Sequence, residues 1–338
     1  MTPAPPQPAS PQLIRWAVAG PGRAAARFAE GLAAVPDARL HAVWARNHEK
    51  AATFAQRFDA EQILDSLSEL ADSPVDAVYV ATHPDSHAAL CIAALEAGKH
   101  VLCEKPAAMN ELQLREVLAV ARRRDRLFME AMKPPFFPLY RRLKQHFESD
   151  PIGQVGFVRA GHADSTRGPD YPLFFPELAG GSIMGIGPYE AFLAVDWLGE
   201  LKRMQVMGRV GPAGASGAGL DMLALVQTEH ENGMAQLHTG LDLLSQGDAV
   251  ISGPLGFALI HANWWNPVRA TVRYRDGRVV ELEEPFAAGG FNYETEHFCQ
   301  LLRVGRRESP VISHNLSLGM ARLLEEARSA LGVRFPGE

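Results

Sequence analysis

The 338-residue sequence has few cysteines, no long apolar run and little excess of charge of either sign. Its three cysteines (Cys91, Cys103 and Cys299) are odd in number and far apart, which predicts reduced thiols and neither a disulfide framework nor a zinc site. No apolar run approaches the roughly 20 residues of a membrane helix. The 33 basic and 39 acidic residues give a net charge of −6, and no segment gathers basic residues with aromatics. We therefore expect a cytoplasmic protein that binds neither nucleic acid nor a membrane.

The first twelve residues also lack the features of an export signal. MTPAPPQPASPQ has neither a charged region nor an apolar one, so we do not expect a signal peptide. Its prolines and small polar residues predict a disordered tail over residues 1–12. The remaining chain is too long for one ordinary core, which predicts two domains.

Short apolar runs alternate with longer helical patterns from residue 14 onward. Such strand-and-helix alternation predicts a doubly wound parallel sheet, that is, an α/β dinucleotide-binding Rossmann domain over residues 13–132. The expected strands cover residues 14–20, 38–46, 76–82, 99–105 and 127–132, and the expected helices cover 23–35, 49–59, 86–98 and 110–124.

The pattern changes after residue 132. Turns such as ENG and RDG separate several strand-like runs, as hairpins require, so we expect residues 133–338 to form an α+β substrate and dimerisation domain with a large open antiparallel sheet. Apolar stretches such as MLALVQT and GFALIHA predict a homodimer or higher homo-oligomer through one face of that sheet. The expected strands cover residues 155–163, 203–209, 221–229, 234–240, 247–252, 256–261, 270–275 and 278–282, and a last helix covers 316–331.

A glycine turn, GPGRAA, follows the first expected strand and opens the first expected helix. Gly20 permits the tight turn, and Gly22 lets the backbone approach a pyrophosphate that the helix N-terminus favours. Ala25 stands at the third glycine position and still permits close packing of helix on strand. An ordinary structural turn is the alternative, but the position in a βαβ series favours dinucleotide binding. The expected cofactor contacts in this turn are Gly20, Gly22, Arg23 and Ala24.

The end of the second expected strand indicates which dinucleotide binds. An NAD site needs an acidic residue near this point, whereas VWARNHEK offers Arg46 and no carboxylate before Glu49. A guanidinium group would bind the 2′-phosphate of NADP. Alternatively, Arg46 only solvates the strand end. The sequence therefore predicts NADP(H) as the preferred cofactor, with NAD(H) possible.

Three motifs together carry a resemblance to a known family. The glycine turn, ATHPDSH (81–87) and EKP (104–106) follow the first, third and fourth expected strands. In this combination the chain resembles the glucose–fructose oxidoreductase/inositol dehydrogenase (Gfo/Idh/MocA) family. The segments MEAM..FFPLY (129–140) and GGSIMGIGPY (180–189), with the C-terminal tail, are most similar to its dihydrodiol/xylose dehydrogenase branch.

The resemblance implies a catalytic pair. Lys105, the lysine of EKP, is expected at the nicotinamide, where partial desolvation would lower its pKa enough for proton transfer. Taken alone, Lys105 would be read as half of a strand-end pair with Glu104. Tyr189 matches the tyrosine proposed as the general acid/base of the branch, and a nearby cationic lysine is expected to lower its pKa.

The resemblance also implies binding residues, and it implies no metal site. His83 alone would be an ordinary loop histidine, but its position after the third strand favours a place along the cofactor. The expected cofactor-binding residues are Thr82, His83, His87, Glu104 and Lys105, and the expected substrate-binding residues are Lys105, Phe137 and Tyr189.

The chain departs from the family pattern in two places. Gly185 occupies a position where the family carries an acid, and KPP (133–135) replaces the Trp-Thr-Arg of the branch. Lys133 restores a positive charge there, without the bidentate geometry of arginine. In HANWWNP, Trp264 and Trp265 are expected to be core or dimer-interface aromatics.

The sequence thus predicts an NADP-dependent oxidoreductase that acts on a secondary hydroxyl or carbonyl of a sugar, polyol or cyclic diol. The main alternative is a non-catalytic dinucleotide-binding or sensor protein of the same fold, which Gly185 favours and the pair of Lys105 with Tyr189 opposes. A family member acting on a non-sugar substrate, such as a tetrapyrrole or an amino-sugar nucleotide, is the third.

Overall fold

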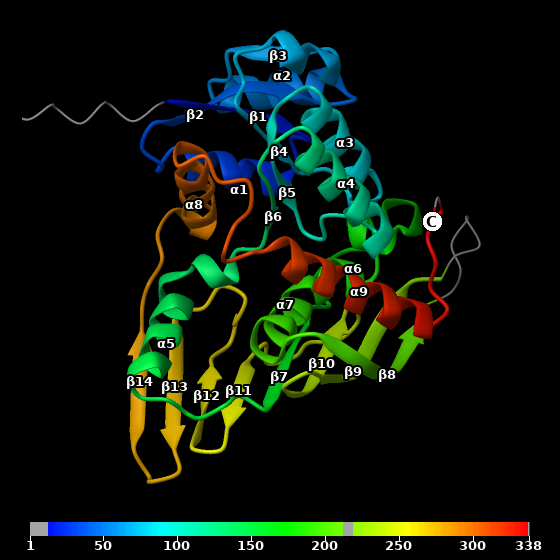
Figure 1. The fold of residues 1–338 in the computed structure, drawn as a ribbon. Coiled ribbons are helices and arrows are strands. Elements are labelled where there is room, and N and C mark those ends of the chain that lie inside the picture. Colours follow the sequence, from blue (N-terminus) through cyan, green and yellow to red (C-terminus); the bar gives the residue numbers. More distant parts are fainter. Residues whose placement is uncertain (1–12, 212–218, 337) are drawn as a thin grey trace, which may run out of the picture.

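The computed structural model describes residues 13–211, 219–336 and 338, so the expected disordered tail lies outside the described residues. Two β-sheets organise the described chain, a six-stranded sheet near the N-terminus and an eight-stranded sheet after it (Figure 1).

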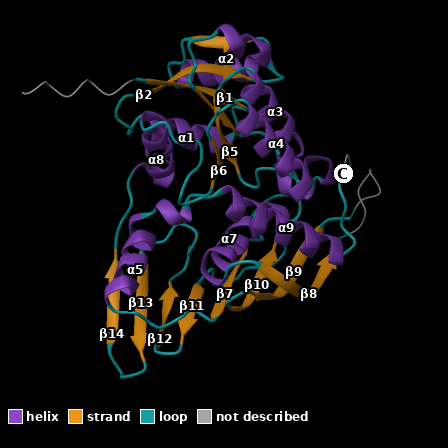
Figure 2. Ribbon diagram, in the orientation of Figure 1, coloured by secondary structure: helices purple, strands orange, loops and turns teal. Residues whose placement is uncertain are grey.

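The six-stranded sheet is parallel throughout and has the order β3-β2-β1-β4-β5-β6. Helices lie on both of its sides (Figure 2), which confirms the predicted doubly wound Rossmann fold. Prediction missed β3, because three residues are too few to show a hydrophobic period. The strands are β1 (Ile14–Ala19), β2 (Ala38–Trp44), β3 (Gln62–Leu64), β4 (Ala77–Val80), β5 (His100–Glu104) and β6 (Phe128–Ala131), and the helices are α1 (Arg23–Leu32), α2 (His48–Arg57), α3 (Pro84–Glu96) and α4 (Glu111–Arg123).

The strand order reverses beside β1, whose neighbours are β2 and β4. A parallel sheet opens a crevice at such a switch point, outside the carboxyl ends of its strands. The glycine turn follows β1 at this crevice, and the segments after β4 and β5 end at the same edge of the sheet.

The eight-stranded sheet has the order β14-β13-β12-β11-β7-β10-β9-β8. Its pairs are antiparallel except β7 with β10, which run parallel. Helices α5 (Pro138–Ser149), α7 (Gly187–Leu198) and α9 (His314–Ala330) cover one face of it (Figure 1). The strands are β7 (Phe157–Ala163), β8 (Leu201–Val210), β9 (Asp221–His230), β10 (Gly233–Gly240), β11 (Ala249–Gly253), β12 (Gly256–Ile260), β13 (Arg269–Tyr274) and β14 (Val279–Glu283).

Helix α8 (Phe291–Arg303), which the sequence analysis did not predict, returns to the N-terminal domain and lies against α1. The ring of Phe298 on α8 lies 5.1 Å from that of Trp16 on β1. His314, at the start of α9, bonds through Nε2 to the carbonyl of Phe128 at 3.2 Å. The predicted boundary after residue 132 therefore separates the two sheets, while the chain between α8 and α9 crosses back over it.

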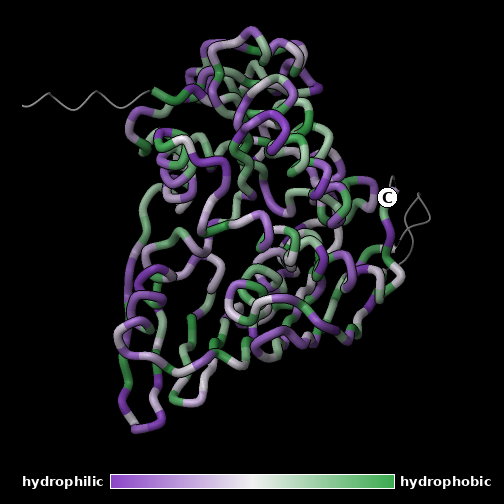
Figure 3. The backbone as a smooth tube through the Cα atoms, in the orientation of Figure 1, coloured by the Kyte–Doolittle hydropathy of each residue, from purple (hydrophilic) through white to green (hydrophobic). Residues whose placement is uncertain are grey.

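Buried apolar side chains of both domains form one continuous cluster. In the N-terminal part, the stacked rings of Phe28 and Tyr79 lie 3.8 Å apart beneath α1. Figure 3 shows hydrophobic segments running through the interior of this domain. Since close-packed interiors deform little, this shared core holds the two domains together around the cleft between them.

No single described helix is long and apolar enough to cross a membrane, although the bent pair Pro176–Gly185 and Gly187–Leu198 would pass by length and composition. Within the same residues, no group of three or more His, Cys, Asp or Glu side chains is placed to hold a metal ion.

Candidate active site

A cavity of about 670 Å³ lies between the two domains, at the carboxyl edge of the six-stranded sheet. Side chains from both domains line it. The N-terminal domain contributes Ala24, Thr82 and Lys105, among others, and the second domain contributes Tyr189 and Trp265.

The glycine turn shapes one end of this cavity. Gly20 has φ +93°, a left-handed conformation that favours glycine, and a Cβ added there would meet Thr82. Gly22 is the N-cap of α1, where an added Cβ would make only an ordinary contact with the Ala81 carbonyl oxygen, and no side chain caps the helix. A helix N-terminus without a cap or an acidic residue fits the pyrophosphate of a dinucleotide. Of the four residues expected in this turn, Arg23 and Ala24 line the cavity, whereas Gly20 and Gly22 form the turn.

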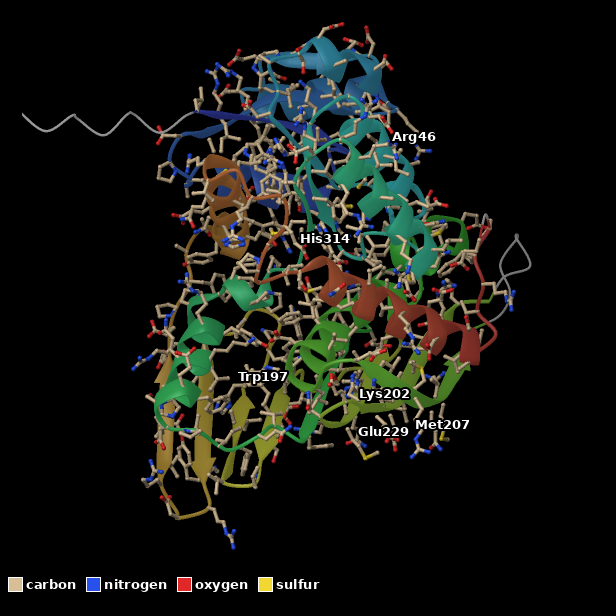
Figure 4. All side chains as sticks on the ribbon, viewed as in Figure 1. Arg46, Trp197, Lys202, Met207, Glu229 and His314 are labelled. Carbon is tan, nitrogen blue, oxygen red and sulfur yellow. The ribbon has the colours of Figure 1, made fainter. Side chains whose placement is uncertain are left out.

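A second cationic area lies beyond the cavity, at the end of β2. Arg46 is exposed there (Figure 4) and precedes Asn47, whose side chain caps α2 by accepting from the Lys50 backbone amide. Burial lowers the pKa of His83, and the positive charges of Arg46 and Lys50 lower it further, against the charge of Asp85. The charges of Arg46 and Lys50 therefore act on the ring of His83, although neither His83 nor Arg46 lines the cavity itself.

His87 is buried and lines the cavity. Its Nδ1 lies 2.8 Å from the Pro106 carbonyl and its Nε2 lies 3.2 Å from the Thr82 carbonyl. Burial lowers the pKa of this histidine. His87 thus joins the segment after β4 to the segment after β5 and positions the two loops that flank the cleft.

Lys105 leaves the end of β5 and points across the cleft. Its Nζ donates a hydrogen bond to the carbonyl of Gly185 at 2.7 Å and lies 4.5 Å from the centre of the Tyr189 ring. Desolvation lowers the pKa of Lys105 to about 8; the charge of Glu104 opposes the shift and that of Lys133 adds to it. The expectation of a lysine with a lowered pKa is confirmed, and the Lys105–Pro106 peptide bond is cis.

Glu104 forms a hydrogen bond with the backbone of this lysine. Its carboxylate accepts from the Tyr79 hydroxyl and from the Lys105 backbone amide. These two hydrogen bonds fix the carboxylate of Glu104, which also lines the cavity.

Tyr189, on the first turn of α7, lines the cavity beside Lys105. The expected lowering of its pKa is wrong: desolvation raises the pKa of this phenol, and the charges of Glu104, Glu294 and Glu190 raise it further. The amine of Lys105 lies over the face of the Tyr189 ring, so the contact between these two side chains is a cation–π interaction. Tyr189 is consequently a protonated phenol at neutral pH.

Gly185 ends the short helix α6 (Ser182–Gly185), at the position where the resemblance implies an acid. A Cβ added to it would overlap the side chain of Leu173, so the space for an acidic side chain is filled. Its backbone carbonyl instead accepts the hydrogen bond of Lys105. A neutral carbonyl thus stands where the resemblance implies a carboxylate, which leaves the charge of the lysine less compensated.

Phe137, expected to bind substrate, is a packing residue instead. Its side chain is fully buried, lies 4.7 Å from the ring of Phe286 and does not line the cavity. The neighbouring positions do reach the cavity: Lys133 lines it, and so does Phe291 at the start of α8. Phe137 therefore supports the wall from behind.

The two adjacent tryptophans of the second domain lie in different environments. Trp264 is fully buried, as expected. Trp265 was expected in the core or at a dimer interface, but it lines the cavity and stacks on His162, with ring centres 3.7 Å apart. No motif marked His162 or the loop that follows it, so sequence reasoning missed this wall. Arg27, also missed, was detectable, since it lies one helical turn after Arg23.

Comparison with known proteins agrees with this geometry. Residues 14–132 match the family profile described as oxidoreductase family, NAD-binding Rossmann fold, and residues 140–256 match that of the GFO/IDH/MocA C-terminal domain. The scyllo-inositol 2-dehydrogenase (NADP(+)) IolU of Bacillus subtilis (strain 168) is 33% identical over 334 residues, covering 96% of this chain and 99% of that protein. The trans-1,2-dihydrobenzene-1,2-diol dehydrogenase of Xenopus laevis is 33% identical over 336 residues, covering 95% and 99%.

Solved structures show the same fold. A 3-ketoreductase from Actinomadura kijaniata, in complex with NADP and TDP-benzene, superposes with a TM-score of 0.81 at 25% identity, covering 94% of this chain and 97% of that one. A levoglucosan dehydrogenase in complex with NADH and levoglucosan gives a TM-score of 0.82 at 18% identity, covering 94% and 98%.

Proposed function

Since the chain belongs to the GFO/IDH/MocA family of oxidoreductases, we propose that it transfers a hydride between NADP(H) and a secondary hydroxyl or carbonyl group of a sugar, polyol or cyclic diol. The observation that carries this proposal is the pairing of Lys105 with Tyr189 across the interdomain cavity. The two side chains come from different domains and meet at the crevice where such sheets bind nucleotides.

The two side chains take different roles in the proposed reaction. NADP(H), when bound, supplies the nicotinamide carbon that exchanges a hydride with the substrate carbon. In the oxidation direction, the neutral amine of Lys105 accepts the proton of the substrate hydroxyl as the carbonyl forms, because its pKa of about 8 is close to neutral pH. Tyr189, whose pKa is raised, stays protonated and donates a hydrogen bond to the same oxygen. In the reduction direction, the lysine ammonium returns the proton.

The cations at the end of β2 support a preference for NADP(H). Arg46 is exposed and free to meet a phosphate, and Lys50 lies one turn into α2. Arginine binds phosphate through charge-assisted hydrogen bonds. Titration calorimetry with both cofactors tests the preference: NADP(H) should bind more tightly than NAD(H), and Arg46→Ala should remove most of the difference. Tighter binding of NAD(H) by the parent protein would overturn it.

The relatives support a hydroxylated ring as the substrate, because their names specify a cyclitol and a cyclic diol. A screen of polyols, aldoses and cyclic diols at the absorbance band of the reduced nicotinamide tests the activity directly. Cofactor-dependent turnover of at least one such compound is expected.

A non-catalytic sensor is the second candidate, and Gly185 is the observation that favours it, since the expected acid is missing. Tight NADP(H) binding without turnover of any hydroxyl or carbonyl compound would select this candidate over the enzyme.

The face of the eight-stranded sheet that the helices leave open supports a homodimer. Figure 4 shows Met207 and Glu229 on this face, away from α7 and α9. Met234, Phe157 and Phe257 are 52%, 40% and 37% exposed and lie in one row across β10, β7 and β12. Burying such a row against a second copy would remove apolar surface from water. Light scattering should give a dimer mass for the parent and a smaller mass for Phe157→Asp; a monomeric parent would contradict the proposal.

Three unpaired, buried cysteines support location in a reducing compartment such as the cytoplasm. Fractionation of the native host, with the protein followed by an antibody, tests this.

A further inference from the structure

The cavity between the domains carries more positive than negative side chains. Both of its carboxylates already accept hydrogen bonds from the protein, Glu104 from Tyr79 and Asp164 from Thr166. The lining cations are Arg23, Arg27, Lys105, Lys133 and Arg167, and the lining carboxylates are Glu104 and Asp164.

Two of these cations have evident tasks. Arg167 pairs with Asp164 at 3.1 Å. Arg23 opens α1 at the turn that would hold a pyrophosphate, and its guanidinium lies 4.2 Å from the centre of the Tyr171 ring. The other three, Arg27, Lys105 and Lys133, form no ion pair with any carboxylate of the part of the chain that the structure describes.

Lys133 is the most unusual of the three, because it is only 8% exposed. Its Nζ donates to Oδ1 of Asn266 at 3.0 Å and lies 4.6 Å from the centre of the Phe291 ring. Burial lowers the pKa of Lys133, and the charge of Glu294 opposes that shift. A buried ammonium group is costly, and an opposite charge placed beside it offsets that cost. Asn266 also lines the cavity, and its amide nitrogen donates no hydrogen bond to another described residue.

The nearest candidate for an internal counter-ion is Glu294, which interacts with Lys133 electrostatically but forms no direct hydrogen bond with it. Its side chain is completely buried and neither oxygen has a hydrogen-bond partner among the described residues. Burial and the charge of Glu104 raise the pKa of this carboxyl, against the charge of Lys133, which lowers it. Lys133 itself lines the cavity, whereas Glu294 does not.

We propose that the substrate carries a carboxylate, bound by the Lys133 amine and the Asn266 amide, with the reacting hydroxyl at Lys105 and Tyr189. This assignment rests on the proposed function and narrows it to acidic sugars or polyols, such as uronic acids. One ammonium and one amide NH₂ group match the two oxygens of a carboxylate better than the three of a phosphate.

Matched substrates test the assignment in the NADP-dependent enzyme. The probes are D-glucuronate against D-glucose, D-galacturonate against D-galactose, and D-glucose 6-phosphate as the phosphate arm. A charged hydrogen bond corresponds to about a 10- to 100-fold effect, so kcat/KM should favour the uronates by that factor. Equal values for uronate and aldose, or a preference for the phosphate, would overturn the carboxylate assignment while the proposed oxidoreductase activity stands.

Variants of Lys133 show whether this residue binds the charged group of the substrate. Lys133→Met should lower the uronate-to-aldose ratio of kcat/KM by about 10- to 100-fold, mainly through KM, because it keeps the length and removes the charge. Lys133→Arg should retain most of the ratio. Lys202→Met is the matched control: this exposed lysine on β8 pairs with Glu200 far from the cavity, and its loss should leave the ratio unchanged (Figure 4). An unchanged ratio in Lys133→Met would refute the role of Lys133.

A binding experiment separates failure of this inference from failure of the proposed function. If the parent protein turns over none of the probes, calorimetric titration of the NADP⁺-loaded protein with D-glucuronate still tests the acid-binding site. Binding that weakens in Lys133→Met, with thermal melting showing that the variant folds, would sustain the site. Absence of binding would overturn it.

Discussion

The two sheets of this protein meet solvent in opposite ways. The parallel sheet is buried on both faces, so that β4 and β6 consist entirely of buried residues. In the second sheet, β9 alternates between buried and more exposed positions, because helices cover only one face. A sheet covered on both faces can present functional groups only at the edge where its strands end, whereas a half-covered sheet also offers a surface.

The two domains also contribute different kinds of residues to the cavity, one set on each side. The side contributed by the parallel sheet comes mainly from segments that directly follow β1, β4 and β5, with Ala131 at the end of β6. These segments would meet the parts common to every reaction, the cofactor and the reacting hydroxyl. The other side is assembled from positions as distant as His162 and Phe291. We therefore expect changes on the first side to affect all substrates and changes on the second side to affect selectivity.

The largest effect is expected from the first side. Lys105→Met should lower turnover of every substrate by a factor on the order of 10²–10⁴, because a positioned proton-transfer group is lost. NADP(H) affinity, measured by titration calorimetry, should change little. Steady-state kinetics on two unrelated substrates provide the check. A loss confined to one substrate would break the proposed division between the two sides.

How far the sequence predicts this molecule follows the same division. The strands of the parallel sheet and the residues at their ends were predictable, because apolar runs, glycine turns and EKP are contiguous in the chain. The wall formed by His162, Trp265 and Asn266 was not, since only tertiary packing brings these residues together. Phe137 and the pKa of Tyr189 were predicted wrongly for a related reason: burial and distant carboxylates act on them, and neither can be seen in a local motif.

Tyr189→Phe should have the next largest effect. Removing a hydrogen-bond donor to the reacting oxygen is expected to lower kcat by about 10- to 100-fold. The rise of the oxidation rate near pH 8 should persist, because Lys105 remains as the proton acceptor. A pH–rate profile distinguishes the roles. Disappearance of that rise in Tyr189→Phe, with Lys105 intact, would assign the proton transfer to the phenol instead.

Gly185→Ala should show a smaller effect, on stability as well as on rate. The added Cβ overlaps Leu173, and relief of such overpacking costs about 1–3 kcal/mol. Denaturant unfolding measures this loss. Combining Gly185→Ala with Leu173→Ala supplies the control, since it opens the space and should recover much of the stability lost through the overlap. No loss in the single variant would show that Leu173 moves aside freely.

The smallest effect is expected from the interaction between Lys105 on the first side and Lys133 on the second. The neutral amine of Lys105 is the form that accepts a proton, so kcat/KM for oxidation should rise as pH increases through about 8. The charge of Lys133 helps to lower the pKa of Lys105, because two like charges share one cavity. Lys133→Met should therefore move the rise to higher pH, reducing oxidation and favouring reduction at neutral pH, whereas Lys133→Arg and Lys202→Met should leave it in place. Profiles measured with a neutral aldose separate this electrostatic effect from substrate charge. If kcat/KM for oxidation of Lys133→Met rises at the same pH as in the parent, the charge of Lys133 does not affect the pKa of Lys105. The second side would then act on selectivity alone.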